Sequence, residues 1–387
     1  MKEGWDYKKL GEVCTVLNGF AFKSGKYTDS GTRIMRITNV QKGFIVDDDP
    51  KYYPSKEMQG LNQYILKEND LLMSLTGNVG RVGLLQKELL PAALNQRVAC
   101  LRIKDYSLSL RFLFHWLNSA VFEQDAIFSA SGIAQKNLST EWLKSYKIAI
   151  PPLSEQQHIV EELDLLSSII EKKKAQLNEL DNLAQSLFYE MFGDPISNEQ
   201  GWEVKKLGKL CITSSGGTPS KTHKEYYEGG NIPWLRSGEV AQGYIYNTEM
   251  YITEEGLNNS SAKYFPINTV VVAMYGATVG QVGILKSRMT TNQAICGIFP
   301  SESFVPTFLM FFLKGMKPVY LKDAAGGAQP NISQGVIKNT LVPIVSLALQ
   351  QQFASKIEAI EHQKELIKQS IKEVETLFNS RMDYYFN

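Results

Sequence analysis

An internal duplication is the feature that most constrains the fold of this chain. Trp5-Asp-Tyr-Lys-Lys-Leu-Gly-Glu-Val-Cys14 returns as Trp202-Glu-Val-Lys-Lys-Leu-Gly-Lys-Leu-Cys211, and Val79-Gly-Arg-Val-Gly-Leu-Leu85 returns as Val279-Gly-Gln-Val-Gly-Ile-Leu285. Shorter matches follow in the same order, with a period of about 195 residues. Two copies are too few for a solenoid. The pattern therefore predicts two similar domains, related as the subunits of a dimer are.

Each copy ends in a segment with the pattern of a long helix. Residues 154–192 contain neither Pro nor Gly, and their apolar side chains recur at alternating spacings of four and three residues. This heptad pattern predicts a coiled-coil seam, and a shift of about 194 residues gives a second seam in the same register. The predicted seam residues are Ile159, Leu163, Leu166, Ile170, Leu177, Leu180, Leu187, Phe353, Ile357, Ile360, Ile367, Ile371, Val374 and Phe378. One lysine in each seam, Lys173 or Lys364, is expected to fix the pairing.

The helices divide the chain into four predicted parts. We expect a first domain over residues 1–150, a first helix over residues 151–195, a second domain over residues 196–346 and a second helix over residues 347–387. Ser154 is a candidate N-cap for the first helix, and Gly193-Asp194-Pro195 ends it. A twofold relation between the copies would make the helices antiparallel, each about 58 Å long. The alternative is that each helix packs only on its own domain.

Within each domain the pattern predicts a mixed, strand-rich structure. Expected strands cover residues 33–38, 70–75, 82–86, 98–103 and 146–150 in the first copy and residues 269–274, 282–286, 294–299 and 341–345 in the second. Residues 110–128 and 306–322 carry apolar side chains at helical spacing. The predicted fold class is α+β, with two pseudo-symmetric, strand-rich mixed α/β domains joined by two long antiparallel coiled-coil helices.

Charge separates along the same boundaries. The formal net charge is +5 over residues 1–150 and +4 over residues 201–346, but −7 over residues 151–200 and −1 over residues 347–387. The total of +1 thus combines two basic domains with acidic helices. Basic domains can neutralise DNA phosphates, and acidic helices would not lie along DNA. Net charges of this size also occur in proteins that never contact DNA.

The absence of targeting features predicts a cytoplasmic protein. The N-terminal residues show no secretory signal, and the longest apolar run, near residues 270–274, is too short to span a bilayer. Cys14, Cys100, Cys211 and Cys296 are widely separated. This spacing favours reduced, buried thiols over a zinc site or a catalytic thiol.

No catalytic motif emerges from the sequence. The segment from Gly19 to Tyr27 is one residue too long for a P-loop and lacks its Ser or Thr, and the four histidines are isolated. We therefore expect no catalytic residue, no metal site and no cofactor in this chain. A self-sufficient enzyme is the open alternative, because paired carboxylates leave no local signature.

Polar side chains cluster at predicted turns, where contacts to bases and phosphates are expected. An Arg fork matches guanine and an Asn or Gln amide matches adenine in the major groove, while Lys, Ser and Thr suit phosphate. The candidate DNA-binding residues are Lys23, Ser24, Arg33, Arg36, Thr76, Asn78, Arg81, Arg97, Lys136, Thr218, Ser220, Lys221, Arg236, Thr278 and Gln281.

Comparison of the two copies separates these candidates further. Asn95 and its counterpart Asn292 are identical, which favours a structural role in which their amides satisfy backbone groups of turns. Arg81 corresponds to Gln281, and Lys136 corresponds to a proline. Side chains that differ between copies are better suited to reading two different sequences. The glycines of Val-Gly-x-Val-Gly are explained by backbone geometry, through positive φ or close approach of another strand.

The arrangement resembles the specificity subunits of type I restriction–modification enzymes over essentially the whole chain. Besides the duplicated Trp…Leu-Gly segments, the motifs that carry the resemblance are Asn18-Gly-Phe-Ala-Phe-Lys-Ser24, Gly216-Gly-Thr-Pro-Ser-Lys221, Ile232-Pro-Trp234, Gly276-Ala-Thr-Val-Gly280, Asn292-Gln293 and Ile150-Pro-Pro152 with Gln156-Gln157. The second copy departs from the last motif, because Val345-Ser-Leu347 replaces the double proline.

The resemblance implies a division of labour. Each basic domain would be a target recognition domain that reads one half of a bipartite, asymmetric site in double-stranded DNA. The antiparallel helices would set the spacing and dock two methyltransferase (M) subunits, which would carry S-adenosylmethionine and methylate adenine. Restriction/translocase (R) subunits would add cleavage that depends on ATP and magnesium. The domains also resemble the DNA-reading domain of adenine methyltransferases that flip their target base.

The chain itself would then be a non-catalytic subunit with no membrane partner. The other hypothesis is a coiled-coil scaffold that pairs other proteins, in which case its basic domains would have no sequence-specific contact with DNA.

Overall fold

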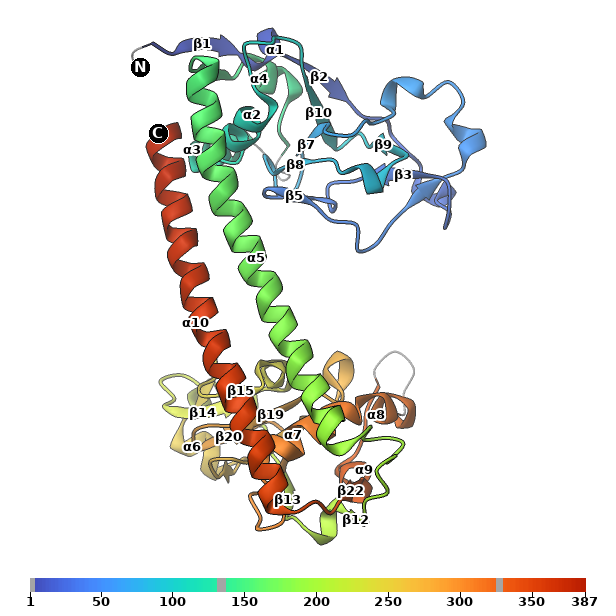
Figure 1. Ribbon diagram of the computed structural model, residues 1–387, viewed down its shortest axis with the longest axis vertical. Coiled ribbons are helices and arrows are strands. Elements are labelled where there is room, and N and C mark those ends of the chain that lie inside the picture. The colour runs from blue at the N-terminus through green and yellow to red at the C-terminus, as the bar shows by residue number, and fades with distance from the viewer. Residues whose placement is uncertain (1–3, 131–136, 325–329) are drawn as a thin grey trace. The chain divides into compact units, whose positions relative to one another are not determined.

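The computed structural model describes residues 4–130, 137–324 and 330–387. The chain forms two units: unit 1 combines Met1–Lys174 with Gln369–Asn387, and unit 2 is the continuous stretch Ala175–Lys368. Each unit therefore contains one strand-rich domain and one end of each of two long helices, α5 (Leu153–Phe192) and α10 (Leu347–Phe386) (Figure 1).

A four-stranded antiparallel sheet in the order β2-β10-β7-β8 is the centre of unit 1. A second sheet has the order β6-β3-β9, in which β3 and β9 run parallel. β1 pairs with β11, and β4 pairs with β5. The strands are β1 (Asp6–Lys9), β2 (Cys14–Asn18), β3 (Thr32–Met35), β4 (Val40–Gln41), β5 (Phe44–Ile45), β6 (Tyr52–Tyr53), β7 (Leu71–Ser74), β8 (Val82–Leu84), β9 (Ala92–Leu94), β10 (Val98–Ile103) and β11 (Lys147–Ile150). The helices are α1 (Leu10–Val13), α2 (Leu110–Leu117), α3 (Ala120–Ser129) and α4 (Thr140–Ser145), with 3-10 turns η1 (Ser24–Lys26), η2 (Ser55–Met58), η3 (Asn62–Tyr64) and η4 (Lys87–Leu89).

Unit 2 repeats this topology. Its central sheet has the order β13-β21-β18-β19-β15, and its second sheet β16-β14-β20-β17 again contains one parallel pair, β14 with β20. The strands are β12 (Val204–Lys206), β13 (Thr213–Ser215), β14 (Ile232–Leu235), β15 (Tyr244–Ile245), β16 (Tyr251–Ile252), β17 (Tyr264–Phe265), β18 (Val270–Ala273), β19 (Val282–Leu285), β20 (Met289–Thr291), β21 (Ile295–Ile298) and β22 (Leu341–Pro343). The helices are α6 (Glu254–Asn258), α7 (Pro306–Gly315), α8 (Lys317–Asp323) and α9 (Gln334–Asn339), with η5 (Leu207–Lys209), η6 (Lys224–Tyr226), η7 (Ser237–Gln242) and η8 (Gly276–Thr278). The duplication seen in the sequence is thus a duplication of fold.

The helix predicted over residues 110–128 is two helices in the structure. α2 ends at Leu117, and Ser119 begins α3 by accepting a hydrogen bond from the backbone N–H of Phe122 at 3.3 Å. The apolar period passes through this break, so the pattern alone does not show it, whereas an N-cap serine ends one helix and starts the next. The counterpart over residues 306–322 is also divided, into α7 and α8, but at Met316 and without a side-chain cap.

The two long helices pair antiparallel inside each unit and also pack on the domain of that unit. In unit 1, Arg381 of α10 binds Glu162 of α5 at 2.5 Å, and Lys174 reaches Glu375 at 3.0 Å. In unit 2, Lys364 binds Asp181 at 2.7 Å. Every predicted seam residue is buried or half-buried. Of the two seam lysines, Lys364 forms an ion pair with the other helix. In unit 1 this ion pair is formed by Lys174, the residue that follows the seam lysine Lys173.

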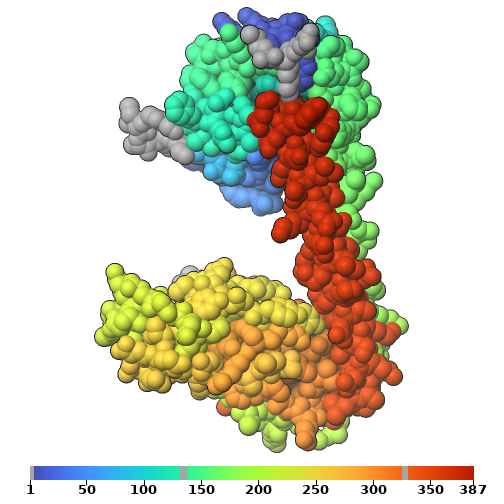
Figure 2. Space-filling view, turned by 90° about the vertical axis from the view of Figure 1, so that its left-hand side faces the viewer, coloured from blue at the N-terminus to red at the C-terminus, as the bar shows by residue number. Residues whose placement is uncertain are grey.

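Large apolar side chains near the ends of the long helices join them to the two domain cores. Met382, Tyr385 and Phe386 of α10 belong to the core of unit 1, and the C-terminal end of α10 lies against that domain in Figure 2. Phe188 and Phe192 of α5 belong to the core of unit 2. Tyr385 continues the heptad spacing of the second seam, whereas Met382, Phe386, Phe188 and Phe192 lie outside it and form a second buried stripe.

The helix starts correct one prediction. α5 begins at Leu153, so Ser154 lies inside the first turn and is not the N-cap. The backbone N–H of Gln156 bonds to the carbonyl of Pro152 at 3.0 Å. α10 begins at Leu347 with the equivalent bond from Gln350 to Ser346 at 3.1 Å. Loss of the double proline therefore leaves the start of the second helix unchanged.

A fully buried glutamine fastens the start of each long helix to its domain. The side-chain oxygen of Gln156 accepts the N–H of Ser109, the N-cap of α2, at 2.7 Å, and its amide donates to the carbonyls of Ser107 and Pro151 at 2.8 Å each. Gln350 makes the same three bonds in unit 2, with the N–H of Val305 at 2.8 Å and with the carbonyls of Ser303 and Val345 at 3.2 and 2.9 Å. The glutamine, and not the double proline, is therefore the part of this motif that both copies keep.

Candidate nucleic-acid interface

The first cluster of DNA-contact candidates lies around β3 in unit 1. Lys23 and Ser24 are exposed at the turn η1. Arg33 is turned inward, where its guanidinium binds Asp47 at 2.7 Å and its side chain is only 17% exposed. Arg36 binds the carbonyl of Asp49 at 2.5 Å. These intramolecular bonds leave little of the Arg33 guanidinium on the surface, and its contact with DNA stays a prediction.

The glycine turn of unit 1 carries a second cluster. Gly80 has φ +77°, and the turn places the guanidinium of Arg81 2.5 Å from the side-chain oxygen of Gln41. Asn78 is exposed, and its amide, turned so that the oxygen faces Arg81, accepts hydrogen bonds at 3.2 and 3.3 Å. Thr76 is half-buried beside them. Thr76, Asn78 and Arg81 are thus brought together on one turn.

The remaining candidates of unit 1 behave differently from one another. Asn95 is buried, and its side-chain oxygen accepts the N–H of Arg97 at 3.2 Å, a bond that holds the turn together as the comparison of copies favours. The Arg97 side chain itself is exposed. Lys136 lies outside the described residues.

In unit 2 the structure gathers several candidates around one pocket of about 480 Å³. Three predicted DNA-binding residues, Thr218, Lys221 and Arg236, line this pocket together with Asn292 and Gln293. The residues that sequence reasoning did not select are Lys224, Tyr227, Glu228, Trp234 and Met250. We call this set the unit 2 pocket. Trp234 was visible in the Ile-Pro-Trp motif, but the candidates were chosen among polar side chains only.

Backbone contacts that only glycine permits shape the unit 2 pocket. A Cβ on Gly216 would lie 2.2 Å from the carbonyl oxygen of Thr291, so the chain can cross this strand only without a side chain. Gly19 approaches the carbonyl of Asn95 equally closely in unit 1. The indole N–H of Trp234 donates to the carbonyl of Gly217 at 2.9 Å. These contacts fix the Gly216–Lys221 loop over the pocket.

Ion pairs orient Arg236 at the rim of the unit 2 pocket. Arg236 binds Glu249 at 2.6 Å and Glu239 at 3.4 Å. Arg36 of unit 1 has an equivalent partner, Asp49, thirteen residues further along the chain. The two units therefore hold an arginine in the same way at the end of β3 and of β14. Thr218 donates to the side-chain oxygen of Gln293 across the pocket.

The other predicted residues of unit 2 lie away from this pocket. Ser220 is exposed and bonds to Thr222 at 2.7 Å. Thr278 donates to the carbonyl of Tyr275 at 2.9 Å within the turn η8. The side-chain oxygen of Gln281 is buried and has no hydrogen-bond partner in the described part of the chain.

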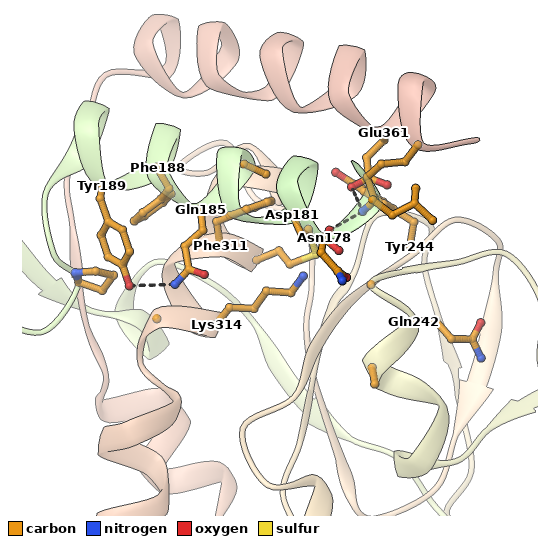
Figure 3. A pocket seen from close by; sticks show the side chains of 18 of the residues that line it. Asn178, Asp181, Gln185, Phe188, Tyr189, Gln242, Tyr244, Phe311, Lys314 and Glu361 are labelled. Atoms are coloured by element: carbon orange, nitrogen blue, oxygen red, sulfur yellow. Dashed lines mark hydrogen bonds and ion pairs between the residues drawn. The ribbon is translucent and has the colours of Figure 1, made fainter. Parts of the chain in front are cut away.

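A second hollow of unit 2, of about 630 Å³, lies where α5, α7 and α10 meet. Figure 3 shows the side chain of Lys314 extended beneath α5 towards Asn178 and Asp181, with Phe311 beside it. Burial lowers the pKa of Lys314, although Glu361 opposes this. Asp181 and Glu361 are both bound to Lys364, at 2.7 and 2.9 Å.

The four thiols are buried, and the acidic groups form no metal-binding cluster in the part of the chain that the structure describes. All four cysteines are buried and free, and burial raises the pKa of Cys14 and of Cys296 to about 12, so neither is a ready nucleophile. Within residues 4–130, 137–324 and 330–387, no group of three or more His, Cys, Asp or Glu could hold a metal ion. Over the same ranges no helix is both long and apolar enough to cross a membrane.

Comparison with known proteins gives a consistent result. A family model described as "Type I restriction modification DNA specificity domain" matches twice, over residues 2–182 and 199–376. The EcoR124I/EcoR124II specificity subunit of Escherichia coli is 24% identical over 298 residues, which cover 73% of this chain and 70% of that subunit. The EcoBI specificity subunit of the same organism is 22% identical, covering 92% of this chain and 79% of that one. The crystal structure of the type I S subunit from M. genitalium has the same fold, with a TM-score of 0.53 and 15% identity over 98% of this chain and 95% of that one.

Proposed function

The chain belongs to the family of type I restriction modification DNA specificity domains, and from this premise we propose that its two domains read the two halves of one bipartite, asymmetric DNA site. It acts on genomic DNA in the cytoplasm and supplies sequence specificity to an enzyme whose chemistry resides in other subunits.

The observation that carries this proposal is that the two domains share one fold but carry different side chains at equivalent positions. The order β2-β10-β7-β8 of unit 1 recurs as β13-β21-β18-β19 in unit 2, and the parallel pair β3–β9 recurs as β14–β20, so both domains can present loops in the same way. Arg81 corresponds to Gln281, and Ile34 of β3 corresponds to Trp234 of β14. One fold with different contact residues is what two different half-sites require, since base contacts specify and phosphate contacts position.

We further propose that the paired helices dock two methyltransferase subunits. Four leucines on the long helices, Leu165, Leu183, Leu366 and Leu377, are between 47% and 61% exposed, which leaves apolar surface outside the seam for partner helices. Lys314 in the hollow of Figure 3 offers a side-chain hydrogen-bond donor to an acidic group of a partner. S-adenosylmethionine would be bound by these partners, and ATP and magnesium by translocase/nuclease subunits.

The spacing between half-sites would follow from the helices. Both α5 and α10 have 40 residues and are continuous, so their length cannot adjust to a different gap without a change in sequence. Heptad-sized insertions preserve the seam, whereas insertions of other sizes rotate one end of the helix relative to the other.

Modified-base sequencing of host DNA, with and without the gene for this chain, tests the proposed function. The expected result is loss of adenine methylation at one bipartite motif when the gene is deleted, and its return when the gene is restored. An exchange of residues 196–346 for the same domain of a relative should change only one half of the motif. Unchanged methylation in a cell that expresses the chain would favour the scaffold hypothesis.

A further inference from the structure

We propose that the unit 2 pocket holds one nucleotide of the target DNA that has left the base stack. The proposal rests on the proposed function and adds a ligand to one of its two domains. It concerns a nucleotide in addition to the adenine that is methylated.

The concave shape of the site determines what it can receive. Bases that remain paired expose their edges at the floor of a groove, and an element that protrudes from the protein is needed to reach them. A pocket can receive only a group that protrudes from the DNA, which is either a backbone phosphate or a base outside the stack. The unit 2 pocket, with about 480 Å³, lies in the range of small-ligand sites and far exceeds what a phosphate group alone fills.

The lining supports a base together with its phosphate. Tyr227, Trp234 and Met250 supply an apolar wall, and the rings of Tyr227 and Trp234 stand edge to face at 5.8 Å. Lys221 and Lys224 are exposed at the rim, and neither forms an ion pair with a carboxylate in the described part of the chain. Aromatic surface next to free lysines is the usual composition of sites for unstacked nucleotides.

Polar groups at the pocket can distinguish one base from another. Arg236 follows β14, and Asn292 and Gln293 follow the adjacent parallel strand β20, so amide and guanidinium groups lie together for the edge of a base. Gln293 is engaged by Thr218, and Arg236 by two carboxylates. These bonds hold the groups in place before DNA arrives, which lowers the entropic cost of binding.

The pocket is also rigidly built. A Cβ on Gly217 would lie 2.2 Å from the backbone nitrogen of Ala262, and the Tyr227 hydroxyl donates to the carbonyl of Pro219 at 2.6 Å. In unit 1 the equivalent loop instead packs Phe20 against Phe22, with ring centroids 5.1 Å apart. The inference is therefore restricted to the half-site that unit 2 reads.

A mismatch scan tests this proposal, because extrusion and groove reading predict opposite signs. The complete methyltransferase, with partner subunits, is titrated with duplexes that carry one mismatch at each position of the half-site read by unit 2. A position read in the groove should lose roughly tenfold or more in affinity per mismatch. An extruded position should gain up to about tenfold, because a mismatched base costs less to remove from the stack.

Two matched double variants assign the gain to the pocket. Lys221→Ala with Lys224→Ala removes the two rim cations, and Lys206→Ala with Lys209→Ala removes two exposed lysines that do not line it. We expect the gain from the mismatch to disappear in the first variant and to persist in the second. Circular dichroism of both variants shows whether the fold is intact.

The outcomes separate this inference from the proposed function. If no position other than the methylated adenines gains affinity while other mismatches weaken binding, the chain reads DNA without holding a nucleotide in this pocket. A gain that survives in the Lys221/Lys224 variant would also overturn the inference. If the wild-type complex shows no sequence preference at all, the proposed function itself fails.

Discussion

Replacement of the buried glutamine at the start of α10 should loosen the connection between helix and domain in unit 2. Gln350→Leu keeps a side chain of similar size and removes three hydrogen bonds, to the N–H of Val305 and to the carbonyls of Ser303 and Val345. Because Gln350 is fully buried, water does not replace these bonds without a structural change.

The magnitude follows from the groups left without a partner. A buried polar group without a hydrogen bond costs about 1 to 3 kcal/mol. The variant leaves one donor and two acceptors in this state, and the low end applies because carbonyls tolerate a missing bond better than N–H groups. We therefore expect a loss of about 3 kcal/mol in the free energy of local opening.

Hydrogen exchange of the Val305 amide measures this loss directly. A local measurement is needed because two units need not unfold as one transition. Exchange should accelerate roughly a hundredfold in Gln350→Leu. The adjacent Gln351 is exposed and serves as the matched control, so Gln351→Leu should change little. Equal exchange in the two variants would refute the view that Gln350 fastens the helix.

Three further predictions concern stability. Burial raises the pKa of Asp164, but hydrogen bonds from His115 and Arg111 outweigh this and lower the pKa to about 2. The stability that this carboxylate contributes is therefore present above its unfolded pKa of about 4 and is lost as the pH falls towards 2. After discounting for partial exposure, this stability is about 1 to 2 kcal/mol. Acid denaturation of the wild type and of Asp164→Asn should show the difference. Lys364→Met should weaken helix pairing in unit 2 by about 1 to 2 kcal/mol in thermal unfolding, because the Lys364 side chain is 14% exposed and bound to two carboxylates. The Lys368 side chain is 51% exposed, so the control Lys368→Met should change stability by less than about 0.5 kcal/mol. Gly216→Ala should distort the unit 2 pocket and lower the melting temperature, since the new Cβ meets the Thr291 carbonyl. The control Gly238→Ala should be tolerated, because a Cβ at Gly238 meets open space. A wild-type melting curve for Gly216→Ala would contradict this explanation.

The long helices and the duplicated fold could be predicted because their signals are periodic. Heptad spacing is set by residues close in sequence, and each seam position needs only an apolar side chain. The aromatic stripe of Phe188 and Phe192 could not be predicted in the same way, because its partners lie on α7, more than a hundred residues away.

The candidate site was predictable only in part. Lys221 and Arg236 were selected as polar residues at turns, and they line one pocket. Trp234 escaped selection because the candidates were restricted to polar side chains. The structure shows that its indole N–H supports the loop at Gly217. The ion pair of Arg33 with Asp47 was equally invisible, because no local rule matches an arginine to a carboxylate in another loop.

The division into units means that unit 2 is inserted within unit 1. Unit 1 takes its first 174 residues from the start of the chain and its last 19 from the end, and Trp5 and Phe386 both contact the ring of Phe112, at 6.3 and 5.7 Å. During synthesis unit 2 can therefore complete its core while the core of unit 1 still lacks the side chains that α10 supplies. Met382, Tyr385 and Phe386 must be synthesised before they can close the core of unit 1, which contains the first residues of the chain. A chain that stops early would thus carry a finished second domain and an open first one.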